Sequence, residues 1–186
     1  MVRWEGGARE RLQLAALRLF GERGYDGVTV AAIAEEAGLT ERTFFRHFAD
    51  KREVLFTGQD EFEHAYTDPI DQADDGAAMA LVAEAIDRAA ERFPDERRPW
   101  SRARQGVIDA DPRLQERELL KLSLLAEAMA AALRRRGIDA ASALLAAENG
   151  VTVFRVAFAQ WIAEDETRSL ADLQREVLRR LRALVA

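Results

Sequence analysis

The sequence of 186 residues contains no cysteine and only two histidines. The lack of cysteine excludes disulfide bonds, thiolate zinc sites and cysteine nucleophiles. No apolar run approaches the roughly 20 residues that a helix needs to cross a bilayer. The first residues, MVRWEGGARERLQ, lack the apolar core of a signal peptide. We therefore expect a cytoplasmic protein with no membrane partner.

Strand-like alternation and internal repeats are equally scarce. Apolar residues recur at steps of three and four almost throughout, which predicts an all-α protein. The segment 149–158, NGVTVFRVAF, contains an Asn-Gly hairpin signal and β-branched residues, but helical spacing continues through it. Glycine, proline and capping residues divide the chain into predicted helices at 8–23, 30–37, 41–48, 51–66, 76–93, 96–110, 112–136, 140–163 and 169–184.

The segment 29–48 predicts a helix-turn-helix. Thr29 and Thr40 are suited to capping two short helices, and Gly38 supplies the positive φ that the turn between them needs. In such a unit the second helix enters the major groove of DNA with its N-terminal residues first. Although the net charge is −6, basic residues are in local excess within residues 40–52: Arg42, Arg46, Lys51 and Arg52 against Glu41 and Asp50.

Most side chains of the second helix have an expected role. Phe44 and Phe48, four residues apart, are expected to dock the helix on its neighbours. Arg42 can bind guanine through two hydrogen bonds. Thr43, Arg46 and His47 are expected to face outward, and Thr40, Thr43, His47 and Lys51 suit phosphates. Together with the cap Thr29 and the phenylalanines of the helix, the DNA-binding candidates are Thr29, Thr40, Arg42, Thr43, Phe44, Phe45, Arg46, His47 and Lys51.

The segment VTVAAIAEEAGLTERTFFRHFADKREVLF resembles the DNA-binding segment of the TetR family of bacterial transcriptional regulators. The resemblance covers residues 8–56 and implies a homodimer on a palindromic operator. It also implies a C-terminal helical domain that binds a small molecule and releases DNA. The family usually has tyrosine, which contacts a phosphate, in the place of Phe45. Because Phe45 has no hydroxyl, we expect it to pack against sugar or backbone.

The domain boundaries follow from this division. Residues 1–50 are predicted to form the DNA-binding domain, and residues 51–186 a helical domain for ligand binding and dimerisation. Its last two helices carry long apolar faces, which can form a four-helix interface with a second copy or cover their own core. The interface candidates are Leu144, Val151, Phe154, Trp161, Leu170, Leu173, Val177 and Leu181.

A largely apolar effector is expected, because aromatic and methionine side chains suit an adaptable apolar pocket. The alternative for each apolar residue is a place in the core. The pocket candidates are Phe62, Tyr66, Met79, Ile86, Phe93, Trp100, Arg104, Val107, Leu122, Met129, Phe154 and Phe158.

Two other functions compete with a DNA-binding repressor. A metal-dependent helical-bundle enzyme would use the Glu-x-x-His step from Glu61 to His64, but such a centre needs two of these steps. A protein–protein adaptor would use the same basic helix. The sequence favours a ligand-responsive repressor that is not an enzyme and needs no metal or other cofactor.

Overall fold

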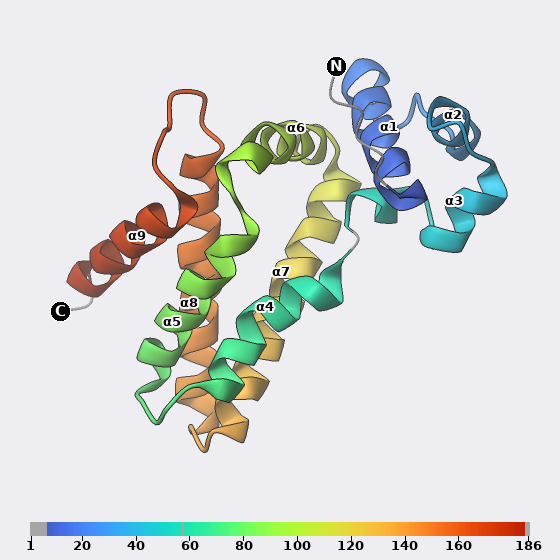
Figure 1. Cartoon of the computed structure of the whole chain (residues 1–186). Coiled ribbons are helices and arrows are strands. Elements are labelled where there is room, and N and C mark those ends of the chain that lie inside the picture. Colours follow the sequence, from blue (N-terminus) through green and yellow to red (C-terminus); the bar gives the residue numbers. More distant parts are fainter. Residues whose placement is uncertain (1–6, 57, 185–186) are drawn as a thin grey trace. The chain divides into compact units, whose positions relative to one another are not determined.

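The computed structural model describes residues 7–56 and 58–184, and all regular structure in those ranges is helical (Figure 1). This confirms the predicted all-α fold. The chain divides into two compact units. One comprises Met1–Thr57 with Ala103–Glu118, and the other comprises Gly58–Arg102 with Leu119–Ala186.

The first unit begins with three helices close to their predicted positions. They are α1 (Ala8–Arg23), α2 (Val30–Glu36) and α3 (Glu41–His47). α1 packs against both α2 and α3. Its apolar face is buried as the 3–4 spacing predicts, with Leu12, Ala16 and Phe20 in the core.

The predicted continuous helix over 51–66 is wrong. Arg52–Leu55 instead form a short 3₁₀ helix, η1, and α4 begins only at Gln59. Gly58, at φ 81°, adopts a left-handed conformation that cannot continue a right-handed helix. Asp50 does accept a hydrogen bond from the backbone N–H of Glu53 at 3.0 Å, but the Glu53 carboxylate binds Arg117 and does not return to the cap.

Residues 103–118 belong to the first unit, which sequence spacing does not indicate. Arg104 donates from Nε to the carbonyl oxygen of Leu55 and from its terminal nitrogen to Glu118, both at 2.8 Å. Arg117 binds both carboxylate oxygens of Glu53, at 2.8 and 3.0 Å. The compact units therefore do not coincide with the functional domains 1–50 and 51–186, which stay predictions.

Two helices continue from one unit into the other along the chain. They are α6 (Arg98–Asp109) and α7 (Pro112–Arg135), with unit boundaries after Arg102 and Glu118. Gly137, at φ 82°, ends α7 as predicted, and the N–H of Ile138 returns to the carbonyl of Leu133 at 3.2 Å.

The second unit is a helical bundle around α8 (Ala140–Trp161). This helix packs against α5 (Ala78–Ala89) and α9 (Leu170–Leu184), and α5 also packs against α4 (Gln59–Gln72) (Figure 1). Two 3₁₀ helices, η2 (Ala90–Arg92) and η3 (Asp95–Arg97), lie between α5 and α6. The segment 149–158 is helical, as its apolar spacing predicts, despite its Asn-Gly pair.

Gly150 marks the closest approach in this bundle. A Cβ atom at this position would lie 2.5 Å from Cγ1 of Val82 and 3.2 Å from Cε of Met129. Val82 and Met129 are fully buried, and the branched Val82 side chain has little rotamer freedom. The absence of a side chain at Gly150 is therefore what lets α8 lie against α5 and α7.

We predict that Gly150→Ala destabilises the protein by about 1–2 kcal/mol. The cost of overpacking exceeds the roughly 1 kcal/mol that alanine gains over glycine inside a helix. Gly106→Ala is the matched control, because nothing lies within 4 Å of the added Cβ in α6. The control should be neutral or stabilising in chemical denaturation, and equal stability of the two variants would contradict the close approach.

Candidate nucleic-acid interface

Both short helices of the 29–48 segment are capped as predicted. Thr29 Oγ1 accepts from the N–H of Ala32 at 3.1 Å, and Thr40 Oγ1 accepts from the N–H of Thr43 at 3.2 Å. Gly38 turns the chain between the helices with φ 65°. The side-chain oxygens of Thr40 and Thr43 also lie 3.1 Å apart. The contacts of Thr40 fix where α3 starts.

The inner side of α3 is held by phenylalanine rings. Phe44 is 0% exposed and Phe48 3%, with ring centroids 5.1 Å apart. This confirms that both residues dock the helix. It also corrects the inclusion of Phe44 among the DNA-contacting candidates, because a fully buried ring cannot touch a nucleic acid.

The outer side of α3 carries Arg42, Phe45 and Arg46, which are all exposed. Among residues 7–56 and 58–184, neither arginine has an ion-pair partner, so both guanidinium groups are available to an anion. Thr43 and His47 are half-buried at the margin of this surface. The Nε2 atom of His47 is buried and has no hydrogen-bond partner within the described part of the chain.

Lys51 has a different role from the predicted phosphate contact. Its Nζ atom donates to the carbonyl oxygens of Tyr25 and Val28, both at 2.8 Å, and lies 4.1 Å from the centroid of the Tyr25 ring. Burial lowers the pKa of the Lys51 ammonium below its ordinary value. The side chain thus ties the loop between α1 and α2 to the segment after α3.

The aromatic effector candidates of the second unit form one cluster. Phe154 lies at its centre, with ring centroids 5.8 Å from Phe62, 6.0 Å from Tyr66, 5.8 Å from Phe93 and 5.5 Å from Phe158. Four further candidates are part of the surrounding core or pack against it: Met79, Ile86, Leu122 and Met129.

Tyr66 is the polar member of this cluster. It is 1% exposed, and its hydroxyl has no hydrogen-bond partner among the described residues. Burial raises the pKa of the phenol far above its ordinary value, so the hydroxyl stays protonated. A buried hydroxyl without a partner costs free energy, which a bound molecule with an accepting oxygen would recover.

Three pocket candidates lie apart from the cluster. Arg104 and Val107 belong to the first unit, and the Arg104 guanidinium is already occupied by Leu55 and Glu118. This corrects the expected role of Arg104. Trp100 packs under the guanidinium of Arg97, which lies 5.2 Å from the ring centroid.

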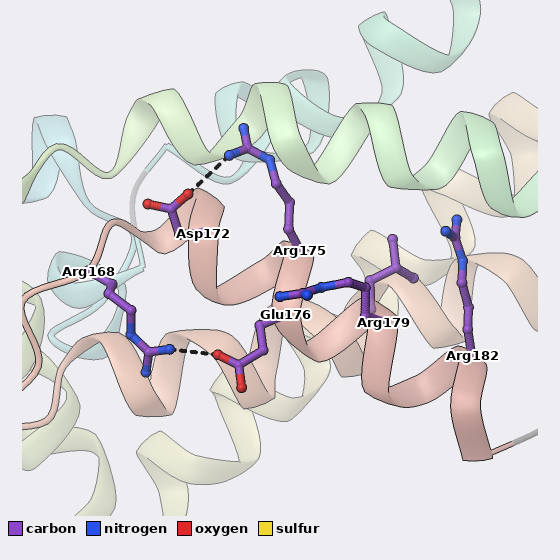
Figure 2. Close-up of a pocket in the computed structure, with 7 residues that line it drawn as sticks. Arg168, Asp172, Arg175, Glu176, Arg179 and Arg182 are labelled. Atoms are coloured by element: carbon purple, nitrogen blue, oxygen red, sulfur yellow. Dashed lines mark hydrogen bonds and ion pairs between the residues drawn. The ribbon is translucent and has the colours of Figure 1, made fainter.

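A separate groove of about 480 Å³ follows α9 (Figure 2). Arg168 forms an ion pair with Glu176 at 2.6 Å, and Arg175 forms one with Asp172 at 3.1 Å. Much of the charge of the groove is therefore paired within it. None of the predicted pocket residues lines this groove, and its charged walls do not suit an apolar effector. It is lined by Arg168, Asp172, Arg175, Glu176, Leu178, Arg179 and Arg182.

The dimer-interface candidates divide into two groups. Six are buried within a single chain and therefore pack in their own core, which is the alternative that the sequence left open: Val151, Phe154, Trp161, Leu170, Leu173 and Val177. Leu144 is 48% exposed and Leu181 is half-buried. Sequence reasoning missed Leu145 and Val156, which are 65% and 42% exposed on α8.

Neither a membrane span nor a metal cluster is found in the described ranges. No helix within residues 7–56 and 58–184 is long and apolar enough to cross a bilayer. The same residues contain no group of three or more His, Cys, Asp or Glu side chains that can hold a metal ion.

Two family models match the chain. Residues 14–57 match the model for bacterial regulatory proteins of the tetR family, and residues 77–186 match the MftR C-terminal domain. Over 58 residues the chain is 45% identical to the HTH-type transcriptional regulator TcmR of Streptomyces glaucescens. That match covers 31% of this chain and 26% of TcmR, so the chain matches about a quarter of the length of this curated relative.

Solved structures share the fold over nearly the whole chain. The transcriptional regulator FadR from Bacillus subtilis, in complex with stearoyl-CoA, aligns with a TM-score of 0.63 at 18% identity, over 92% of this chain and 96% of FadR. The fatty acid degradation regulator FadR from Bacillus halodurans aligns with a TM-score of 0.55 at 16% identity, over 96% of each chain. At these identities the likeness shows the fold alone.

We predict that Lys51→Met lowers the free energy of unfolding by about 1–3 kcal/mol, because two partly buried carbonyl groups lose their charged donor. Arg46→Met is the control, since Arg46 is exposed, and its effect should stay within about 0.5 kcal/mol. Denaturant titration of both variants checks this. If Lys51→Met were as stable as the wild type, Lys51 would again be a candidate for DNA contact.

Proposed function

The chain belongs to the tetR family of bacterial regulatory proteins, and from that premise we propose that it is a cytoplasmic, ligand-responsive repressor. It binds a palindromic operator as a homodimer and leaves it when a small molecule binds the C-terminal domain. The observation that carries this proposal is the outer side of α3. Arg42 and Arg46 are exposed on one side of this helix, while Phe44 on the opposite side is buried and holds the helix in place.

DNA recognition falls to residues within 1–50. Arg42 reads a guanine edge through two hydrogen bonds, and Arg46, Thr40, Thr43 and His47 bind the phosphates beside it. Among these, His47 is half-buried at the margin of the exposed surface of α3. Thr29 acts as the cap of α2.

Effector binding falls to the aromatic cluster of the second unit. Phe62, Phe93 and Phe158 are half-buried, so the cluster reaches the surface at these rings. A largely apolar molecule would replace contacts among the rings. The complex of B. subtilis FadR with stearoyl-CoA is a precedent in this fold for an effector with a long apolar part.

The effector signal requires a corrected path. The sequence suggested one long helix from residue 51, but α4 starts at Gln59 and the left-handed Gly58 separates it from η1. α6 and α7 run without interruption between the units and hold Glu53 and the Leu55 carbonyl through Arg117 and Arg104. To release DNA, an effector need only bind more tightly to the conformation in which the two recognition helices do not fit the operator half-sites. The difference between its affinities for the two conformations sets the size of the response.

Dimerisation uses the exposed side of α8. Two half-sites lie about 34–36 Å apart and need two recognition helices. Leu144, Leu145 and Val156 are large apolar side chains that one chain leaves exposed on this helix. They provide the self-complementary surface that a two-fold interface requires.

An adaptor that binds protein through the same basic helix is the main alternative. DNA binding releases counterions from phosphates, so affinity for duplex DNA falls steeply as salt rises. Retention on duplex DNA that depends on salt therefore separates the two functions.

Selection of bound duplexes from a random library at physiological salt tests the proposal. We expect an enriched inverted repeat. Arg42→Ala should relax base preference at one position of each half-site, by roughly 1–3 kcal/mol. The control is Arg179→Ala, an exposed arginine of α9, which should leave the consensus unchanged. Absence of both enrichment and salt-dependent retention would favour the adaptor.

A second prediction concerns the dimer. Leu145→Glu should weaken dimerisation more than tenfold, since two carboxylates would face each other across the two-fold axis at a cost of ~2 kcal/mol or more. Leu120→Glu, a similarly exposed leucine of α7, is the control. Sedimentation equilibrium measures both variants. An unchanged dimer in Leu145→Glu would exclude this side of α8 as the interface.

A further inference from the structure

Phe45 is an exception among the phenylalanines. The chain has nine phenylalanines, all within the described ranges, and Phe45 alone is exposed, at 54%. It lies on α3 between the two exposed arginines, in the part of the molecule where a charged surface is expected to approach.

Contact with the ring of Phe44 restricts the orientation of the Phe45 ring. Its centroid lies 5.5 Å from that of Phe44, with the ring planes at 80°, an edge-on contact. Phe44 is itself fully buried and pairs with Phe48, so it forms a fixed platform. An edge-on pair of this kind is a favourable aromatic geometry. The outer edge of the Phe45 ring is therefore presented to solvent in a defined position.

Phe45 and Arg42 face the same way. They are three residues apart on one helix, and such neighbours have Cβ atoms about 5–6 Å apart. Successive base pairs are about 3.4 Å apart along duplex DNA. Side chains at this spacing reach base pairs that are adjacent or separated by one step.

The chemistry of the surface selects one partner for the ring. Arg42 and Arg46 on either side require an anionic partner, whereas the phenyl ring offers neither a donor nor an acceptor. The major groove combines both properties at thymine, whose C5-methyl group is an apolar contact site next to the phosphate backbone. A sugar–phosphate contact would leave the base-facing edge of the ring without a partner.

We propose that Phe45 contacts the methyl group of a thymine within two base pairs of the guanine read by Arg42, and so helps to set operator sequence. This inference rests on the proposed DNA-binding function and adds a second base-reading residue to it. It replaces the expectation that Phe45 packs against sugar or backbone.

The test removes one methyl group at a time. In the selected operator, each thymine is replaced by deoxyuridine at symmetric positions of both half-sites, and affinity is measured by fluorescence anisotropy. At one thymine per half-site, the wild type should lose roughly fourfold in affinity per methyl group, the value of one buried methylene-sized group. Deoxyuridine keeps the Watson–Crick pairing and the same hydrogen-bonding atoms in the groove.

Variants of Phe45 assign the effect to the ring. Phe45→Ala should bind the thymine and deoxyuridine operators equally at that position. Phe45→Tyr keeps the ring and should keep the preference for thymine. Leu14→Ala removes a similarly exposed apolar side chain from α1 and should keep both affinity and preference. Thermal melting of each variant verifies that the first unit is folded.

The outcomes separate this inference from the function on which it rests. Specific, salt-dependent binding with no sensitivity to any thymine methyl group would overturn the role of Phe45 and leave the repressor proposal intact. The same holds if Phe45→Ala keeps the wild-type sensitivity, or if no thymine lies within two base pairs of the Arg42 guanine. Failure of sequence-specific binding in the wild type would overturn both.

Discussion

The buried guanidinium of Arg104 is the contact on which the first unit depends. It is 7% exposed, donates to the Leu55 carbonyl and to Glu118, and stacks 5.1 Å from the centroid of the Phe56 ring. A cation withdrawn from water is tolerated only where such partners compensate its lost hydration. Arg104 thereby joins α6 and the first part of α7 to η1, and η1 packs against α1. α3 takes its position from that same α1.

In the proposed recognition of DNA, the residues of α3 divide into those that hold the helix in place and those that face outward. Phe44, with Phe48 just beyond the helix, carries the packing, and threonine oxygens fix the helix start. The arginines contribute little to the fold and remain available. Lys51 shows the opposite use of a cation: it lies within hydrogen-bond distance of two carbonyls and is absorbed by the structure. A positive charge alone therefore does not show whether a side chain stabilises the fold or stays exposed. The number of hydrogen-bond acceptors near it decides this.

Local patterns predicted the local features well. Caps at Thr29 and Thr40, glycine stops and apolar spacing placed α1, α2 and α3 within a residue or so at each end, and they kept 149–158 helical. The 51–66 helix failed because the pattern could not show that Gly58 adopts a left-handed conformation. Arg104 was misplaced for a different reason: its partner Leu55 is far away in sequence, and periodicity carries no information on long-range pairs.

Apolar spacing also could not distinguish core from interface. Val151 and Val177 recur at the same helical steps as Leu144, yet only Leu144 of these three is exposed. Both environments favour the same residue types, so the difference appears only when neighbouring helices are in place. Phe45 is the converse case, an aromatic residue whose type predicts burial and whose position on α3 leaves it open.

The contribution of residues 103–118 to the first unit limits how this protein can be recombined. Three chain crossings, after residues 57, 102 and 118, connect the compact units. A graft of residues 7–56 onto another effector-binding body would leave behind the partners of Glu53, the Leu55 carbonyl and Asp26, which are Arg117, Arg104 and Arg113. The transferable module is thus discontinuous in sequence, and exchange of operator preference between relatives must move both segments or change single side chains of α3 alone.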